Sequence, residues 1–269
     1  MPEGDTVWRT AHRLDEVFAG HLLTLADLRW PGLSTYQLAG TPTREVVPRG
    51  KHILHRLESG WTIHSHLRMD GSWRIERRSG RAPSASPRLR AVLGTDAYLA
   101  LGWSLGMLDV VRTTEEHTLV GHLGPDILGS DWDADGAVAN LRATSVPLAD
   151  ALLDQTNLAG IGTMWASEGL FVARLNPFAD ASEIEPAALR ALLDRTQRLM
   201  RASCASAVPS STGSRVASES TYVHGRRHRP CRRCGTLVAM RFSGPATRER
   251  TIYYCPACQG VPNLPATGS

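Results

Sequence analysis

Apolar side chains recur three or four positions apart near the start of the chain, at Val7, Ala11, Leu14 and Phe18. This period predicts an amphipathic helix over residues 5–19, with Asp5 or Thr6 as its N-cap. Short runs rich in β-branched and aromatic residues follow, separated by Gly, Pro and Ser, at residues 22–30, 45–57, 61–67, 73–76, 89–93 and 97–103. Their spacing predicts an antiparallel sandwich or barrel, with residues 78–87 as an exposed loop.

The period changes again after residues 124–126. Apolar positions at helical spacing predict helices over residues 137–142, 148–155, 164–173 and 186–204. Six serines among residues 205–220 predict a mobile loop. The fold class expected from these patterns is α+β, with an N-terminal helix and sandwich over residues 1–123 and a helical domain over residues 124–220.

Length and composition agree with this picture. The chain has 269 residues, of which 42% are hydrophobic and 21% charged, which excludes a disordered or fibrous protein and allows two domains. No apolar run approaches the roughly 18 residues that suggest a membrane span, and the start of the chain is acidic where a signal peptide is basic. We therefore expect a cytoplasmic protein with no membrane partner.

Basic residues are concentrated near the C-terminus. The net charge is only +4, but residues 221–250 hold eight arginines and two histidines against one acid, Glu249. Such a stripe is typical of surfaces that neutralise phosphates. A solvated tail is the alternative.

Four of the five cysteines have the spacing of a metal site. Cys231-x2-Cys234 and Cys255-x2-Cys258 are separated by twenty residues. Two such pairs complete a closed tetrahedral site, so we predict one structural Zn²⁺ on a hairpin of residues 236–242 and 251–254. A redox dithiol or a chance arrangement is the alternative. Cys204 lies on a predicted helix and is expected to be a core residue.

Two amines stand out as candidate chemistry. Removal of Met1 would make Pro2 the N-terminus, and its secondary amine can condense with an aldehyde to give an iminium, with Glu3 beside it to move protons. The chain has one lysine, Lys51, among 30 Lys and Arg residues. Codon bias explains the arginines, but a single retained lysine also suggests a position that needs an amine able to lose a proton.

Several separated motifs carry a family resemblance. They are Pro2-Glu3-Gly4, Arg49-Gly50-Lys51-His52, His66-Leu67-Arg68-Met69-Asp70-Gly71, Leu153-Asp154-Gln155, Ala159-Gly160-Ile161-Gly162 and residues 250–259. In order and spacing they resemble the formamidopyrimidine-DNA glycosylase and endonuclease VIII family over residues 2–260. The resemblance implies a four-cysteine zinc finger over residues 221–260, a tail over residues 261–269, and a helix-two turns-helix element over residues 152–171.

The resemblance also implies an activity, that of a bifunctional DNA glycosylase and AP lyase in base excision repair. Pro2 would attack C1′ of the damaged nucleotide and form a Schiff base, and Glu3 would act as general acid and base. Lys51 would contact phosphate and donate a proton in β-elimination. Arg250 would bind the phosphates at the lesion and assist δ-elimination.

Further positions are candidate DNA contacts. Met69, with Arg68 beside it, matches the family's wedge that fills the space left by a flipped base, although a methionine there also suits the sandwich core. His66 is a phosphate ligand or a strand hydrogen-bonding residue. Gly162 and Thr163 begin a predicted helix whose amides can approach phosphate, and Thr163 replaces the family's usual asparagine.

The residues around His122, Gly121 to Asp126, resemble the endonuclease VIII branch, and no Arg-Arg-Phe-Gly stretch of the other branch follows the strands. The expected substrate is therefore double-stranded DNA with an oxidised pyrimidine or an abasic site, bound by a monomer that is nucleoid-associated if bacterial. The alternatives are a non-catalytic binder of damaged or abasic DNA and a glycosylase for oxidised purines.

Overall fold

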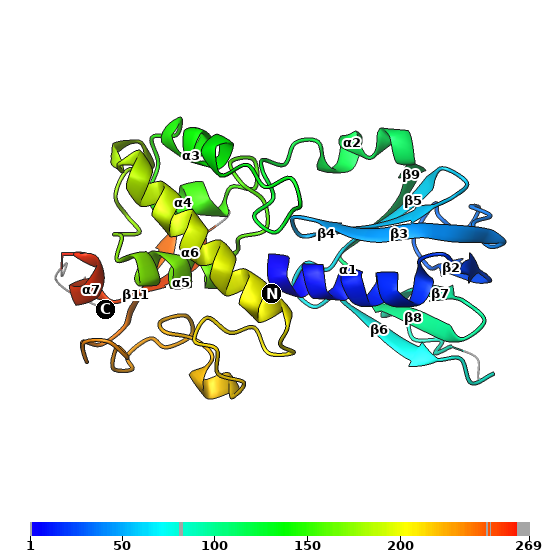
Figure 1. Cartoon of the computed structure of the whole chain (residues 1–269). Helices are drawn as coiled ribbons and strands as arrows, with labels where there is room; N and C mark the ends of the chain where they lie inside the picture. Colours follow the sequence, from blue (N-terminus) through cyan, green and yellow to red (C-terminus); the bar gives the residue numbers. More distant parts are fainter. Residues whose placement is uncertain (1, 81–82, 246, 248, 263–269) are drawn as a thin grey trace. The chain divides into compact units, whose positions relative to one another are not determined.

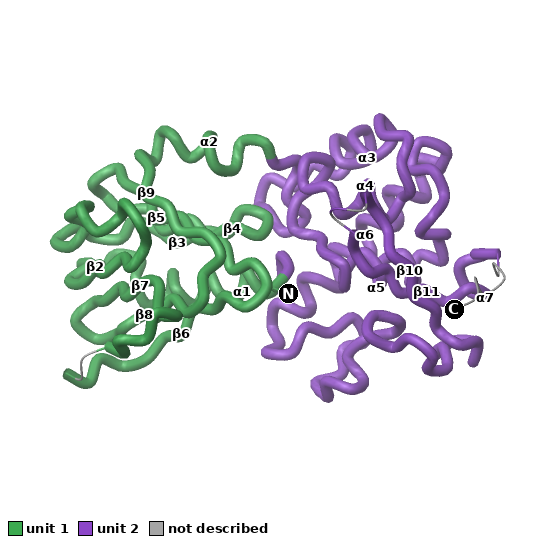
Figure 2. The backbone as a smooth tube through the Cα atoms, turned by 180° about the vertical axis from the view of Figure 1, so that it is seen from behind, with its two compact units in different colours: residues 1–2, 6–122 green, residues 3–5, 123–269 purple. Residues whose placement is uncertain are grey.

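The computed structural model describes the chain except for residues 1, 81–82, 246, 248 and 263–269. The chain forms two compact units, residues 1–2 with 6–122 (unit 1) and residues 3–5 with 123–269 (unit 2), drawn in green and purple in Figure 2. The expected tail lies outside the described residues from residue 263 on. No helix in the described part of the chain is both long and apolar enough to span a membrane.

Unit 1 combines one long helix with two antiparallel sheets (Figure 1). Helix α1 spans Gly4–Phe18 and belongs to unit 1 from Thr6 on. The five-stranded sheet has the order β1 (Leu22–Leu23), β3 (Thr41–Arg49), β4 (His52–Leu57), β5 (Trp61–His66) and β9 (Met107–Arg112). The four-stranded sheet has the order β2 (Leu25–Leu28), β7 (Leu89–Gly94), β8 (Tyr98–Trp103) and β6 (Ser72–Arg77). The predicted antiparallel sandwich is confirmed.

One core joins the helix to both sheets. The four apolar residues that predicted α1 are at most 1% exposed. They share a cluster with Ile53 and Ile63 of the five-stranded sheet and with Leu93 of the four-stranded sheet. Burial of each such side chain contributes roughly 1.5–3 kcal/mol, so the amphipathic pattern fixes which face of α1 packs inward.

The sequence expectations were wrong or incomplete at three points in residues 1–122. The run at residues 45–57 is two strands, because Gly50 and Lys51 form a two-residue turn between the paired Arg49 and His52. Gly50 has a φ of 58°, which a glycine adopts without strain. Strand β9 and helix α2 (His117–Val120) were not predicted. Neither Asp5 nor Thr6 is an N-cap, because α1 already begins at Gly4.

Unit 2 is mainly helical. Its helices are α3 (Ala134–Arg142), α4 (Leu148–Leu153), α5 (Thr163–Ala173), α6 (Pro186–Cys204) and α7 (Pro256–Gln259). The bounds predicted for α6 are confirmed. Helix α4 ends two residues before its predicted end, because the Asp154 carboxylate accepts hydrogen bonds from Thr156 N (2.9 Å) and Thr156 Oγ1 (2.8 Å), which turns the chain.

A two-stranded hairpin completes unit 2. Strand β10 (Ala239–Ser243) pairs with β11 (Arg250–Tyr254) in antiparallel register, and Ser243 faces Arg250. The hairpin predicted from the cysteine spacing is therefore present. Its turn begins one residue later than predicted, because Ser243 belongs to the strand.

Helix α5 is the central element of unit 2. Trp165, Leu170 and Phe171 are fully buried, and a helix that is apolar on all sides belongs in a core. Glu168 on this helix is also fully buried. Its carboxylate accepts hydrogen bonds from the Ser211 hydroxyl and from three consecutive backbone N–H groups, those of Tyr222, Val223 and His224 (2.7–2.8 Å). Burial raises the pKa of Glu168, and these hydrogen bonds oppose the shift.

The serine-rich segment of residues 205–220 makes specific hydrogen bonds. Ser211 binds Glu168 through its hydroxyl, and Ser210 N donates to Ser203 Oγ at 3.1 Å. Ser203 Oγ in turn donates to Asp5 Oδ2 at 2.6 Å. Ser211 therefore attaches this segment directly to buried Glu168, and Ser210 attaches it indirectly, through Ser203 of α6, to buried Asp5. The mobility of the segment remains a prediction.

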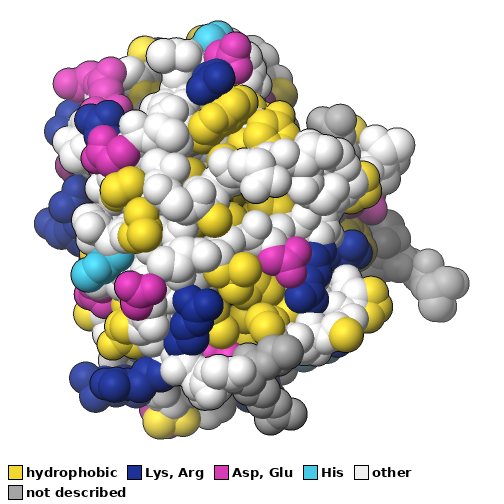
Figure 3. All heavy atoms as spheres, turned by 90° about the vertical axis from the view of Figure 1, so that its right-hand side faces the viewer, with side chains coloured by type: hydrophobic (Ala, Val, Ile, Leu, Met, Phe, Trp, Pro, Cys, Tyr) yellow, Lys and Arg dark blue, Asp and Glu magenta, His cyan; other side chains and the backbone are white. Residues whose placement is uncertain are grey.

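One face of the protein surface carries side chains of both charges. On the face drawn in Figure 3, basic side chains (dark blue) are interspersed with acidic ones (magenta) and with hydrophobic ones (yellow). This face is therefore not a continuous basic surface, in contrast to the arginine-rich sequence of residues 221–250.

Candidate functional site

Glu3 is seated on the N-terminus of helix α5. Its carboxylate accepts hydrogen bonds from the backbone N–H groups of Gly162 (2.9 Å), Met164 (2.8 Å) and Trp165 (3.1 Å), and Glu3 is 4% exposed. The first N–H groups of a helix have no partner within the helix and carry its positive dipole end. A carboxylate at this place satisfies them, so the start of α5 fixes the Glu3 side chain.

Glycines allow the two segments to approach this closely. A Cβ atom on Gly162 would lie 2.4 Å from Glu3 Cδ, and one on Gly4 would lie 2.9 Å from Gly160 O. Gly4 N also donates to Gly160 O at 2.9 Å. The motifs around Glu3 and Gly162 are thus in direct contact, although about 160 residues separate them in sequence. Thr163, the first residue of α5, lies between two donors to Glu3.

Gln155 holds the two turns between α4 and α5. Its amide nitrogen donates to Leu153 O (2.9 Å) and Ile161 O (3.0 Å), and its amide oxygen accepts from Gly160 N (3.1 Å). One side chain thereby satisfies three backbone groups of the helix-two turns-helix element. Gln155 of the Leu153-Asp154-Gln155 motif therefore helps to hold the turns before the N-terminus of α5 in place.

Most other predicted site residues lie in unit 1. Pro2 is partly exposed, and Lys51 is at the tip of the β3–β4 hairpin. Met69 is 60% exposed in the turn after β5, so the alternative that it packs in the sandwich core is wrong. Arg68 beside it has a φ of 55°, and a Cβ on Gly106 would lie 2.0 Å from Arg68 Cγ. The turn therefore packs closely at its base and presents Met69 outward.

Sequence reasoning named His66 and His122 singly but missed that they belong to a row of histidines in unit 1. His52 Nδ1 lies 2.8 Å from His64 Nε2, and His64 Nδ1 lies 2.9 Å from Asp109 Oδ2. The ring of His66 is 4.7 Å from that of His52, and the exposed ring of His122 is 6.5 Å from it, measured between centroids. The available signal was the alternation of His64 and His66 in β5, but only the strand register shows that they meet His52 of β4.

Burial lowers the pKa of three histidines of the five-stranded sheet, so their rings are neutral at pH 7. It lowers the pKa of His66 to about 4 and that of His64 as well, although Asp109 opposes the shift of His64. His55, which is 3% exposed and bonds Thr43 Oγ1 through Nε2 (2.7 Å), has its pKa lowered by burial to about 3. At acid pH, protonation of these three rings would place a positive charge inside the protein, where the low dielectric disfavours it.

We expect the stability of the fold to fall as the pH drops below about 6.5. The unfolded chain binds protons there while buried His55 does not, so this stabilising contribution is present above pH 6.5 and declines by about 1.4 kcal/mol per pH unit toward pH 3. Urea unfolding at pH 7.5, 6.0 and 5.0 would measure the slope. A free energy of unfolding that is constant across this range would contradict the prediction.

Arg250 is the exposed first residue of β11. It lines a cavity of about 650 Å³ together with Ser243 of β10, Asp150 of α4 and Gln155 of the two-turn segment. The predicted tip arginine is thus beside the helix-two turns-helix element within unit 2.

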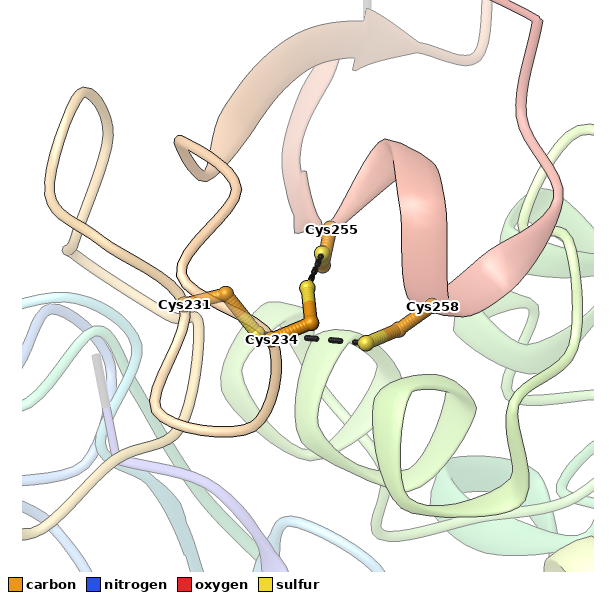
Figure 4. A group of neighbouring side chains, drawn as sticks. All are labelled: Cys231, Cys234, Cys255 and Cys258. Carbon is orange, nitrogen blue, oxygen red and sulfur yellow. Dashed lines mark hydrogen bonds between the residues drawn. The ribbon is translucent and has the colours of Figure 1, made fainter.

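The four predicted cysteines form one cluster. Cys234 Sγ lies 3.5 Å from Cys255 Sγ, and Cys231 Sγ lies 4.0 Å from Cys258 Sγ (Figure 4). All four sulfur atoms are within 4.8 Å of one another, and no other group of metal ligands occurs among the residues that the structure describes. Zinc–sulfur bonds of about 2.3 Å in a tetrahedron place sulfurs about 3.8 Å apart, so the donor set fits a tetrahedral metal.

The arginine stripe has two roles. Arg226 donates to Tyr222 O (2.6 Å) and Pro230 O (2.9 Å), and Arg233 stacks 4.2 Å from the Phe171 ring centroid. Arg241 lies 5.0 Å from the Phe178 ring centroid. These arginines therefore stabilise the cysteine-bearing region, and exposed Arg227, Arg229 and Arg250 remain as candidates for phosphate.

Two family models match the chain. The formamidopyrimidine-DNA glycosylase N-terminal domain matches residues 1–110, and the formamidopyrimidine-DNA glycosylase H2TH domain matches residues 123–214. A protein of Streptomyces coelicolor named probable endonuclease 8 2 is 45% identical over 265 residues, which cover 97% of this chain and 95% of the relative. The chain belongs to the formamidopyrimidine-DNA glycosylase and endonuclease VIII family.

Other members of the family agree on the branch and the fold. A Mycolicibacterium smegmatis protein named DNA-(apurinic or apyrimidinic site) lyase Nei2 is 40% identical, covering 96% of this chain and 99% of the relative. The structure of the MutM (Fpg) protein from Thermus thermophilus has a TM-score of 0.77 at 29% identity, covering 96% of this chain and 99% of that one. The Lactococcus lactis Fpg structure, at 21% identity and a TM-score of 0.81 over 96% and 99% of the two chains, supports the fold alone. The resemblance inferred from the motifs is confirmed.

Proposed function

We propose that this protein is a bifunctional DNA glycosylase and AP lyase of base excision repair that excises oxidised bases, preferably pyrimidines, through an N-terminal proline. Family membership and the names of the relatives, endonuclease 8 and DNA-(apurinic or apyrimidinic site) lyase, support the activity. The observation that carries the mechanism is Glu3, held by three N–H groups of α5 directly after Pro2 in the chain.

The proposed chemistry begins at the two residues of this N-terminal segment. After removal of Met1, the Pro2 nitrogen attacks C1′ of the damaged nucleotide, and the bond from C1′ to the base breaks as the base leaves with a proton. The C1′–O4′ bond then breaks and O4′ takes a proton, which opens the sugar and leaves an iminium between Pro2 and C1′. This iminium withdraws electrons, which allows loss of the C2′ proton and β-elimination of the 3′ phosphate. Glu3 moves protons at the sugar from its fixed position.

Other residues would hold the DNA. Lys51 at its hairpin tip contacts phosphate and donates a proton during β-elimination, and Arg250 binds lesion phosphates and assists δ-elimination. Met69 fills the space that a flipped nucleotide leaves, a role that its 60% exposure supports. His66, Arg68, His122, Gly162 and Thr163 are proposed as further DNA contacts.

The four cysteines would hold one structural Zn²⁺. A site made of four cysteine thiolates leaves no open coordination position, so the ion would fix the fold of the β10–β11 region and take no part in the reaction. The partner would be double-stranded DNA with an oxidised base or an abasic site, bound by a monomer in the cytoplasm. Related Lactococcus lactis structures are described as complexes with DNA that contains an abasic site, which supports this partner class.

Borohydride trapping tests the nucleophile, and the lone lysine makes the test sharp. Only two amines in the chain can form a Schiff base, the N-terminal Pro2 nitrogen and Lys51 Nζ. With a duplex that contains an abasic site, we expect a covalent adduct in the wild type and in Lys51→Arg, and none when an extra N-terminal residue precedes Pro2. Mass spectrometry of the digested adduct locates the modified residue.

The outcomes separate the alternatives. An adduct that disappears in Lys51→Arg and persists with the blocked N-terminus would overturn the role of Pro2. Binding of the same duplex without any adduct would indicate a non-catalytic sensor. Rates on duplexes with thymine glycol, dihydrouracil and 8-oxoguanine test the substrate class, and faster cleavage of 8-oxoguanine would overturn the preference for pyrimidines.

A further inference from the structure

The histidine row on the five-stranded sheet is not used by the proposed chemistry as a unit. His52 pairs in register with His66, and His64 pairs with Asp109, so these side chains share one face of β4, β5 and β9. The opposite face carries core residues such as Ile53. Burying these polar side chains against a core sheet costs desolvation free energy unless each of them is hydrogen-bonded. Their hydrogen bonds therefore decide whether the row is stable.

The hydrogen bonds determine where each proton lies. The Asp109 carboxylate can only accept, so His64 Nδ1 carries a proton and His64 Nε2 accepts from His52 Nδ1–H. In the neutral ring, His52 Nε2 is then an acceptor. His66 is opposite in sense, because its Nδ1 accepts from Arg68 N at 2.9 Å and its proton lies on Nε2. His52 therefore presents a hydrogen-bond acceptor at Nε2, whereas the adjoining His66 presents a donor at its Nε2.

The surroundings of His52 favour an anion. The charged and titratable groups that act on His52, His64 or His66 are Lys51, Arg68, His122, Asp109 and Glu116, with the three rings themselves. Arg56 neutralises Glu116 at 2.7 Å. Asp109 is at the end of the hydrogen-bonded series that is farthest from His52, with His64 between them. The groups that act directly on His52 are all cationic or imidazole, and among the described residues these rings are not grouped at metal-binding distances.

We propose that His52 is a further phosphate-binding residue, positioned by His64 and Asp109, and that a DNA phosphodiester bound beside His52 and His66 brings one proton from solvent onto His52 Nε2. This inference rests on the proposed binding of DNA. In the complex the charges alternate along one line: phosphate oxygen, His52 imidazolium, neutral His64 and the Asp109 carboxylate. Every hydrogen bond in that line keeps a donor facing an acceptor.

Burial and the neighbouring positive groups explain why the proton arrives only with the phosphate. Burial, followed by the charges of His64, His66, His122 and Arg68, lowers the pKa of His52 to about 3 in the free protein. An anion at hydrogen-bonding distance favours the charged ring and acts against both causes. Binding should therefore be linked to proton uptake that rises toward one proton as the pH falls below the pKa of the bound ring.

The test measures affinity against pH. Dissociation constants for a duplex with a tetrahydrofuran abasic analogue are determined at pH 7.5 and 5.5 at constant ionic strength, for the wild type, His52→Gln and Asp109→Asn. If the bound ring titrates near pH 6, the wild type gains about fourfold in affinity at the lower pH, and His52→Gln does not. Asp109→Asn, which removes the charge that supports the chain, should give a smaller gain than the wild type.

His117→Gln is the matched control, because His117 is exposed on α2 and the one contact that the described structure gives its ring is with Thr114 O. It should keep the pH dependence of the wild type. Nitrogen-15 NMR of the free protein gives an independent readout, with the His52 proton on Nδ1 in the wild type and mixed tautomers in Asp109→Asn. Equal pH dependence in His52→Gln and the wild type would overturn the inference, whereas failure of every variant to bind the duplex at either pH would overturn the proposed function instead.

Discussion

Replacing Glu3 with glutamine is expected to slow lesion processing by about 10²–10⁴-fold, the usual range for loss of a general acid or base. The carboxylate is proposed to move protons at the sugar, and an amide cannot. Glutamine also presents an NH2 group on one side, so it cannot accept from donors to both oxygens as Glu3 does from Gly162 and Met164. Single-turnover kinetics on abasic and thymine-glycol duplexes would measure the loss.

Two controls separate chemistry from folding in this variant. An unpaired N–H at the start of α5 costs about 1–3 kcal/mol, which thermal unfolding would detect independently of activity. Gly162→Ala keeps the carboxylate but displaces it, because the added Cβ would lie 2.4 Å from Glu3 Cδ, and it should also lower the rate. Glu16→Gln, an exposed position on α1, should match the wild type. A Glu3→Gln rate within about threefold of the wild type would contradict the role assigned to Glu3.

Long periodic segments were predictable from sequence. Helix α6 has the predicted bounds, and α1 differs from its prediction by one residue at each end, because both have a continuous apolar stripe. The cysteine cluster was equally predictable, since the spacing within each pair brings two sulfurs to one metal without any knowledge of the remaining fold.

Features that depend on pairing between distant segments were not predictable. The pattern around Gly50 predicts one strand although Arg49 and Lys51 flank the glycine, and β9 carries Asp109 among apolar residues and shows no clear alternation. Asp109 became interpretable only through its register with His64. The sequence supplies residue types, but the register decides which of them meet.

The candidate site follows the same division. Glu3 and Gly162 were both identified by motif, yet nothing local in either motif predicts that the Glu3 carboxylate caps α5. The burial of Glu168 was not predictable, because one glutamate in an apolar helix is indistinguishable in sequence from a surface residue. Its three backbone donors lie 54 to 56 residues away.

Removal of the metal is expected to weaken DNA binding by at least about 10²-fold. The cysteine-bearing region resembles small structural zinc modules, which fold only with their ion. The apolar cluster around the cysteines has only five buried members, two of which are Cys231 and Cys255. A core of this size does not hold a hairpin in place without a cross-link. Arg250, which begins β11, would lose its fixed position. Fluorescence anisotropy with an abasic-analogue duplex, before and after chelation, would measure the change.

The loss should be local and reversible. Helices α1 and α6 pack without the cysteine cluster, so far-UV circular dichroism should change little, and added Zn²⁺ should restore affinity with one ion per chain. Cys255→Ser should behave like the chelated protein even with Zn²⁺ present, whereas Cys204→Ala, on α6 and outside the cluster, should bind like the wild type. Undiminished affinity in the fully metal-free protein would contradict the prediction and would show that other contacts hold the hairpin, such as Tyr253 N to Ser167 Oγ (3.1 Å) and Arg241 on the Phe178 ring.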